Sequence, residues 1–401
     1  MRKILWFAAL TAALACSGAN AQQVNVKIGV LSDMSSLYSD VGGPGSVAAA
    51  KLAIADFTKV NPNVKVDMIS GDHQNKPDIG SSLANQWFDV DKVDMIVDVP
   101  NSGVALAVSQ IANQKNKVFL VSGAAASDLT GPKCNANTIH WTYDTWMLAN
   151  GTGKAIVKTG GDTWFFLTAD YAFGYALERD TAAAVEGNGG KVLGKVRHPL
   201  NTNDFSSFLL QAQASKAKII GLANAGGDTI NAIKQGAEFG IVKGGQKFAG
   251  LLVFASDVNA LGLPTAQGLT LTETWYWDMN DANRAWTKRW QAENPGKLPS
   301  MVVAGVYAET LHYLKAVAAL KSAADGKAVV NQMKALPTDD PLFGKGYIRA
   351  DGRKIHPAYL FQVKKPEESK YPGDDYILRA TIPAEEAFRP MKDDNCPMVT
   401  N

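Results

Sequence analysis

The chain has 401 residues, of which 46% are hydrophobic and 19% charged, and its formal net charge is +2. This length allows two domains with large hydrophobic cores. A nearly neutral chain without basic clusters argues against nucleic acid and against anionic membrane surfaces as partners.

The N-terminus has the pattern of an export signal. Two basic residues precede the apolar run Ile4–Ala15, and the small-residue cleavage pattern Ala19-Asn20-Ala21 follows. The apolar run is too short to anchor the chain across a bilayer. We therefore expect residues 1–21 to be a signal peptide and the mature, exported chain to begin at Gln22. Cleavage removes two positive charges and no negative ones, which leaves a net charge of zero.

The cysteines leave two questions open. Cys16 raises the alternative of a lipoprotein, although Ala13 stands where lipoproteins usually have leucine. Cys134 and Cys396 remain in the mature chain, and an oxidising compartment permits a disulfide between them. A disulfide requires the two residues to be close in space, which the sequence does not show.

Short strands alternate with helices in the first part of the chain. Apolar runs rich in Val and Ile are typical of parallel strands buried on both faces. This alternation predicts a doubly wound parallel sheet. We expect strands at residues 26–33, 64–69, 94–99 and 118–122, and helices at 46–60, 77–88 and 104–112.

A second series follows an extended segment at 138–145. One continuous sheet would need about ten strands, so we predict a second sheet. Its expected strands are 164–168, 191–198, 218–223 and 248–254, and its expected helices are 148–159, 174–187, 205–214 and 228–239.

The last part of the chain is predicted to be mixed. Helices are expected at 283–293, 301–320 and 327–336, after an extended segment at 268–278. Two strands around Asp351-Gly352 are expected within 347–363, because Asp-Gly is a common hairpin turn. The tail after Pro366 is rich in proline and charge, and we expect it to wrap the surface.

These elements predict an α/β fold of two doubly wound lobes. Extended segments near 139–146, 271–279 and 345–358 would form a three-segment hinge, and the cleft between such lobes is the usual place for a small ligand. The predicted bounds are 22–143 and 276–353 for lobe one, and 144–275 and 354–401 for lobe two with the C-terminal tail.

Two turns after strands of the first sheet carry candidate binding groups. They offer Asn101, Ser102 and Ser127, beside small residues at Gly123 and Ala124–Ala126 that leave the backbone accessible. Helix N-termini at such turns present unpaired N–H groups. We predict a site for an anionic or carbonyl group without a catalytic side chain. The alternative, that these side chains only cap helices, stays open.

Several motifs together resemble one family. The chain is similar to the type I periplasmic solute-binding proteins of ABC importers, typified by the leucine/isoleucine/valine-binding protein, over nearly all of its mature length. The motifs are residues 26–57, FLVSGAAASDLTG at 119–131, LTADYAFGYAL at 167–177, DFSSFLLQ at 204–211 and FQV at 361–363. The resemblance implies a monomer in the periplasm that delivers a small molecule to an ABC permease and its ATPase.

The resemblance also implies roles for single residues. The family's carboxylate-binding positions fall on Asn101, Ser102, Ala124, Ala125 and Ser127. The aromatic residue that closes over the ligand falls on Tyr171 or Phe173, and the acidic residue that pairs with the ligand ammonium falls on Asp257. A further pocket tyrosine of the amino-acid binders falls near Ala225, where this chain has no tyrosine.

These departures favour an acid without an α-amino group, such as an aromatic acid. A buried ammonium needs a paired charge or several acceptors, and Asp257 as that charge keeps branched-chain amino acids as the alternative. Tyr143, between Trp141 and Trp146 at the first hinge segment, and Tyr38, after the first strand, are further candidates to face a flat ligand. A ligand sensor of the same fold is a second alternative.

The motifs of other chemistries are missing. Gly42-Gly43-Pro44-Gly45 matches neither a dinucleotide fingerprint nor a P-loop, and neither G-x-S-x-G nor H-E-x-x-H occurs. The five histidines lack metal-ligand spacing. We therefore predict no enzymatic activity, no cofactor and no metal, with an exported hydrolase as the weakest alternative.

Overall fold

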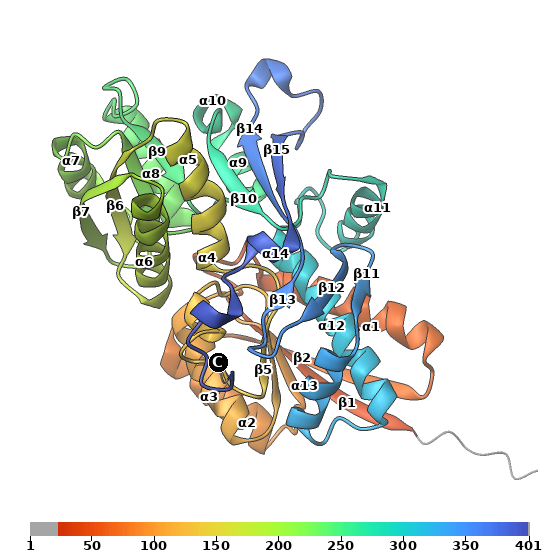
Figure 1. Cartoon of the computed structure of the whole chain (residues 1–401). Coiled ribbons are helices and arrows are strands. Elements are labelled where there is room, and N and C mark those ends of the chain that lie inside the picture. Colours follow the sequence, from red (N-terminus) through yellow and green to blue (C-terminus); the bar gives the residue numbers. More distant parts are fainter. Residues whose placement is uncertain (1–22, 400–401) are drawn as a thin grey trace, which may run out of the picture.

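Two α/β lobes make up the protein, and a computed structural model describes it from residue 23 to residue 399 (Figure 1). The predicted signal peptide, with Cys16 and the start at Gln22, lies outside the described residues. Within them, no helix is both long enough and apolar enough to cross a membrane.

Lobe one is built on a five-stranded parallel sheet in the order β2-β1-β3-β4-β5. Its strands are β1 (Val24–Ser32), β2 (Val64–Asp72), β3 (Met95–Asp98), β4 (Val118–Val121) and β5 (Thr138–His140). Its helices are α1 (Gly43–Val60), α2 (Pro77–Asp89), α3 (Ser102–Gln114), α11 (Asp281–Trp290), α12 (Met301–Leu320) and α13 (Gly326–Ala335).

Alternate residues of these strands enter two different cores. Val97 and Leu120 belong to the core that includes residues of α1 and α12, whereas Ile96 and Phe119 belong to the core with α2 and α3. Successive side chains of a strand point to opposite faces, so both faces of the sheet are covered. This confirms the doubly wound arrangement predicted for the first lobe.

Lobe two has a four-stranded parallel sheet in the order β7-β6-β8-β9. Its strands are β6 (Thr163–Ala169), β7 (Lys191–His198), β8 (Ile219–Ala223) and β9 (Lys247–Gly250). Its helices are α6 (Ala172–Gly187), α7 (Ser206–Ala214), α8 (Gly227–Glu238), α9 (Ala255–Leu261) and α10 (Leu263–Ala266). The predicted strand 248–254 ends at Gly250, and residues 251–254 lead from it to α9, which begins at Ala255. The exact residue bounds of the two lobes stay a prediction.

A third, antiparallel sheet stands beside lobe two. It consists of β10 (Thr270–Glu273), β14 (Ala358–Val363) and β15 (Tyr376–Ile382) in the order β10-β14-β15. The expected hairpin around Gly352 pairs β12 (Gly344–Ile348) with β13 (Lys354–Ile355), and β11 (Thr338–Asp340) joins it. The expected second strand of that hairpin is split, since β14 pairs in the other sheet.

The first crossover between the lobes is shorter than predicted. The strand expected to reach residue 145 ends at His140, and the helix begins at Thr145, because the Asp144 carboxylate accepts a hydrogen bond from Met147 N at 2.8 Å. The helical segment runs from α4 (Thr145–Leu148) through a π-helical turn to α5 (Lys154–Lys158).

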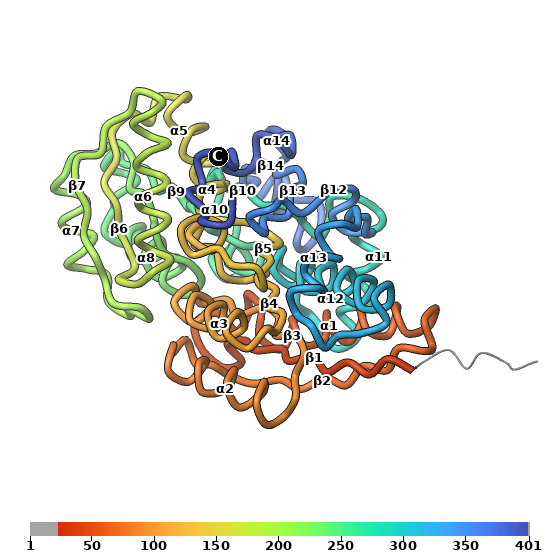
Figure 2. Tube along the Cα trace, turned by 60° about the horizontal axis from the view of Figure 1, so that its bottom comes forward, coloured from red at the N-terminus to blue at the C-terminus, as the bar shows by residue number. Residues whose placement is uncertain are grey.

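The C-terminal tail lies against the region where the lobes meet. Both views place the dark blue C-terminal segment beside α4 (Figures 1 and 2). A disulfide joins Cys396 to Cys134 of lobe one, with 5.6 Å between their Cα atoms. Residues 376–382 of the tail, which was expected only to wrap the surface, form β15, and the short helix α14 (Ala384–Ala387) follows.

Candidate functional site

A narrow cavity lies between the lobes, near the carboxyl ends of their strands. Its lining is aromatic or small and apolar, and no charged side chain contributes to it. The lining residues are Tyr38, Val41, Pro100, Gly123, Ala125, Tyr143, Tyr171, Phe173, Ala225, Leu252 and Phe254. Two wider grooves are lined by residues of lobe two and the antiparallel sheet alone, whereas this cavity draws on the turns after strands of both lobes.

Five of the ten predicted site residues line this cavity. Tyr38 comes from the loop after β1, Ala125 from the turn after β4, and Tyr143 from the first crossover; Tyr171 and Phe173 stand at the start of α6. Val41, Pro100, Leu252 and Phe254 line it as well and were not predicted. Their signal in the sequence is weak, because apolar residues after strands are equally common in ordinary cores.

The polar side chains predicted after β3 have partners within lobe one. The side-chain oxygen Oδ1 of Asn101 accepts hydrogen bonds from the N–H groups of Gly103 and Val104, at 2.9 and 3.1 Å, and so caps α3. The Ser102 hydroxyl accepts from the N–H groups of Ala125 and Ala126 at 3.3 and 3.2 Å. Ser102 therefore touches the turn after β4 without lining the cavity.

Ser127 and Asp257 also have partners away from the cavity. The Ser127 hydroxyl donates to Asp180 on α6 at 2.6 Å, and Arg389 of the tail donates to the same hydroxyl at 3.1 Å. The Asp257 carboxylate accepts from Phe254 N at 3.0 Å at the start of α9. Burial raises the pKa of Asp257 to about 7. Neither residue belongs to the lining.

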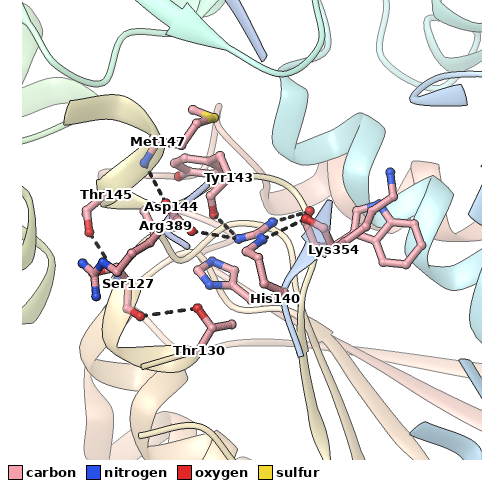
Figure 3. A network of polar contacts seen from close by, with 12 residues as sticks. Ser127, Thr130, His140, Tyr143, Asp144, Thr145, Met147, Lys354 and Arg389 are labelled. Carbon is pink, nitrogen blue, oxygen red and sulfur yellow. Dashed lines mark hydrogen bonds and ion pairs between the residues drawn. The ribbon is translucent and has the colours of Figure 1, made fainter. Parts of the chain in front are cut away.

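The turn after β4 has its carbonyl groups fixed by the first crossover. The carbonyl oxygens of Gly123, Ala124 and Ala125 are bonded by Tyr143 Oη at 2.6 Å, His140 Nε2 at 2.8 Å and Thr145 N at 2.8 Å. Figure 3 shows Tyr143, His140 and Thr145 gathered around this crossover. The carbonyl groups of this turn are therefore engaged, and its N–H groups are the backbone groups left to bind a ligand, as in anion-binding backbone concavities.

These N–H groups form a candidate cradle for a carboxylate. Among the residues described, none accepts a hydrogen bond from the N–H of Gly123 or Ala124, although both residues are buried. Those of Ala125 and Ala126 share the single Ser102 hydroxyl. Buried N–H groups without partners are rare in proteins, and a carboxylate would satisfy them. We call residues 123–126 the N–H cradle.

Histidine 140 is a positioning residue that the sequence did not single out. Burial, together with the nearby Arg353 guanidinium, holds the pKa of His140 well below 6.5. The ring is therefore neutral, and Nε2 carries the proton that it donates to the Ala124 carbonyl. This bond fixes the middle of the N–H cradle.

Arg353 clamps the first crossover to the third. It is fully buried and donates to the carbonyl oxygens of Tyr143, at 2.9 Å, and Trp141, and its guanidinium lies 3.5 Å from the Asp144 carboxylate. Burial lowers the pKa of Arg353 to about 10, so it stays charged at neutral pH. Arg353 thus fixes the backbone of Tyr143, and the Tyr143 hydroxyl in turn fixes the Gly123 carbonyl.

The two lobes touch across the cavity. Tyr38 Oη of lobe one lies 2.6 Å from Tyr171 Oη of lobe two. Beside this pair, Leu37 packs on Gly226 and Gly227 at the start of α8; a Cβ on Gly226 would lie 2.9 Å from the Leu37 carbonyl oxygen. With φ of +56°, Gly226 also adopts a backbone conformation that favours glycine. The lobes therefore stand in a closed arrangement.

A buried carboxyl group lies directly behind the lining. Asp98 Oδ2 accepts from the Ser32 hydroxyl at 2.7 Å, whereas Oδ1 has no partner within residues 23–399. A Cβ on Gly123 would lie 2.8 Å from Oδ1. Asp98 and Val99 have φ of +84° and +54°, which is strained for a β-branched residue such as Val99. Burial raises the pKa of Asp98 to about 6.

Metal ligands are not gathered in the described part of the chain, where no group of three His, Cys, Asp or Glu side chains could hold an ion. The arrangement offers hydrogen-bond donors, hydroxyl groups and aromatic faces.

Comparisons with known proteins agree with this geometry. The family model described as periplasmic binding protein matches residues 25–370. A solved periplasmic binding protein of Burkholderia mallei is 51% identical, with a TM-score of 0.90 over 94% of this chain and 99% of that one. A branched chain amino acid ABC transporter periplasmic ligand-binding protein of Burkholderia xenovorans LB400 is 39% identical, with a TM-score of 0.81 over 93% and 99%.

A curated relative extends the comparison. Leu/Ile/Val-binding protein homolog 6 of Brucella melitensis is 26% identical over 383 residues, which cover 92% of this chain and 95% of that protein. The family match, the two lobes and the cavity between them lead to one conclusion. The chain belongs to the periplasmic binding protein family, in the type I group of ABC-transporter solute-binding proteins.

Proposed function

We propose that this protein captures a small aromatic carboxylic acid in the periplasm and delivers it to an ABC permease and its ATPase, without catalysing a reaction. The observation that carries the proposal is the lining of the cavity between the lobes, where five aromatic rings and no charged side chain meet the N–H cradle. The family membership supports the transport role.

The cradle supplies the recognition of the acid group. A carboxylate at Gly123 and Ala124 accepts hydrogen bonds from N–H groups that otherwise stay buried and unpaired. Such charge-assisted bonds are stronger than bonds between neutral groups. Because the donors belong to the backbone, the carboxylate needs no arginine or lysine beside it.

The aromatic side chains of the lining would bind the planar ring of the ligand. The rings of Tyr171 and Phe173 have centroids 6.0 Å apart, and those of Tyr143 and Phe254 are 6.4 Å apart at nearly right angles. Aromatic pairs favour such tilted and edge-to-face arrangements, which a ligand ring can join. A Rhodopseudomonas palustris solute-binding protein in complex with benzoate has the same fold at 20% identity, so this fold accommodates such a ligand.

A branched-chain amino acid is the second candidate. It is favoured by the name of the Burkholderia xenovorans relative and by the unpartnered Oδ1 of Asp98 behind Gly123, which could pair with an ammonium group. Against it, Asp257, the expected partner of an ammonium, is engaged with Phe254 N outside the lining. A buried ammonium without a paired charge is costly.

A ligand screen separates the two candidates. The purified mature chain is heated with benzoate, phenylacetate, cyclohexanecarboxylate, leucine or valine, and the affinities of active compounds are measured by calorimetry. A ligand that binds only the folded state raises the melting temperature by mass action. We expect benzoate or phenylacetate to give the largest shift. A shift with leucine and valine alone would replace the aromatic acid by an amino acid.

A further inference from the structure

The hydroxyl groups of Tyr38 and Tyr171 form a pair in which one O–H donor has no acceptor. Each tyrosine brings one O–H donor, and the contact of 2.6 Å between the two oxygens uses one of them. Between residues 23 and 399 neither hydroxyl has another hydrogen-bond partner. One O–H therefore stays free at the wall of the cavity.

Both hydroxyls are protonated and held in place. Burial raises the pKa of Tyr38 and of Tyr171 well above 10. The Tyr38 N–H donates to Asp33 Oδ2 at 2.8 Å, and the Tyr171 N–H donates to the Ala169 carbonyl at 2.8 Å, immediately before α6. Both residues are therefore anchored through their backbones at the wall of the cavity.

The free O–H and the N–H cradle belong to the same cavity but to different elements. Gly123 and Ala125 line it from the turn after β4, whereas Tyr38 and Tyr171 line it from the loop after β1 and the start of α6. A carboxylate bound at the cradle leaves the tyrosine donor without a partner. A buried donor without an acceptor weakens the binding of such a ligand.

We propose that the Tyr38–Tyr171 pair selects aromatic acids that carry a hydroxyl group on the ring. This inference rests on the proposed function and narrows it. The ring hydroxyl accepts the free O–H of the pair and donates its own O–H to the other tyrosine oxygen, which can still accept, while the carboxylate occupies the N–H cradle. A ligand with a methyl group at the same place fills the same volume and leaves the donor unpaired.

The test compares ligands of equal size. Binding of 3- and 4-hydroxybenzoate and of 3- and 4-methylbenzoate to the mature chain is measured by calorimetry. We expect at least one hydroxybenzoate to bind about tenfold tighter than its methyl counterpart, since about 1.4 kcal/mol corresponds to a factor of ten. Equal affinities of both pairs would overturn the inference, whereas binding of any of these acids would leave the proposed function standing.

Three variants locate the preference. In Tyr38→Phe and in Tyr171→Phe the remaining hydroxyl keeps its own O–H, so the preference stays while both affinities fall with the loss of the contact between the lobes. In the double variant no donor remains, and the preference disappears. Tyr175→Phe is the matched control, because its hydroxyl, on the same helix α6 as Phe173, donates to Asp170 and does not line the cavity. A preference that survives in the folded double variant, as judged by circular dichroism, contradicts the inference.

Discussion

At the scale of the residue, Gly123 is the position where the cavity tolerates least change. A Cβ there would lie 2.7 Å from Pro100 Cα and 2.8 Å from Asp98 Oδ1, and neither atom can move without shifting the strained turn after β3. We expect Gly123→Ala to destabilise the protein by about 1–3 kcal/mol in urea unfolding and to weaken ligand binding. The control Gly187→Ala meets no atom within 4 Å at the end of α6, so it should leave ligand binding unchanged and should not lower the stability, because alanine favours a helix more than glycine does.

The buried carboxyl group of Asp98 should make the stability of the protein depend on pH. Burial raises its pKa from 3.8 to about 6, so between these values the folded state binds a proton that the unfolded state has lost. The free energy of unfolding should therefore fall as pH rises from about 4 to 6, by up to about 3 kcal/mol from this residue. Asp98→Asn removes the titrating group and should flatten that decline in denaturant titrations at several pH values. Parallel curves for the two proteins would contradict this role of Asp98.

At the scale of the element, the sequence predicts strands and helices wherever burial follows from the element's own periodicity. Helix α12 and strand β7 have the predicted bounds. The predicted strand 248–254 was wrong beyond Gly250. Leu252 and Phe254, whose apolar side chains suggested a strand, line the cavity and do not belong to the sheet. Strand β15 was missed, because four consecutive residues of this edge strand, Leu378–Thr381, are exposed and polar or small apart from Leu378.

The same distinction applies to the candidate site. Aromatic residues after strands and at the hinge were predicted to face the ligand, and the structure brings Tyr38, Tyr143 and Tyr171 to one cavity. The partners of Ser127 could not be predicted, since Asp180 and Arg389 lie 53 and 262 positions away in the sequence. Pairing over such distances depends on how the lobes and the tail meet, which no local pattern encodes.

The C-terminal tail is an element whose attachment can be tested. The disulfide Cys134–Cys396 closes a loop of 262 residues in sequence separation, and Arg389 adds contacts to Ser127 and Asp180. We expect the double variant Cys134→Ser/Cys396→Ser to lose about 2–5 kcal/mol of stability, with increased hydrogen exchange in residues 383–399. Wild-type protein treated with a reductant should show the same loss of stability and the same increase in hydrogen exchange. Unchanged exchange in the tail would show that the ion pairs alone hold it.

At the scale of the whole molecule, closure depends on how the crossovers are joined, and Arg353 is the residue that joins them. Arg353→Met would leave Asp144 as a buried, unpaired charge and would free the carbonyl oxygens of Trp141 and Tyr143, a loss of about 3–5 kcal/mol. The double variant Arg353→Met/Asp144→Asn removes that charge and should regain part of the stability. Neither residue belongs to the cavity lining, although Arg353 holds the carbonyl of the lining residue Tyr143. Because the loosened hinge shifts the population away from the closed arrangement, small-angle scattering of the ligand-free double variant should give a larger radius of gyration than the wild type, and saturating ligand should reduce the difference. Equal radii together with wild-type affinity would show that the crossovers are held without this ion pair.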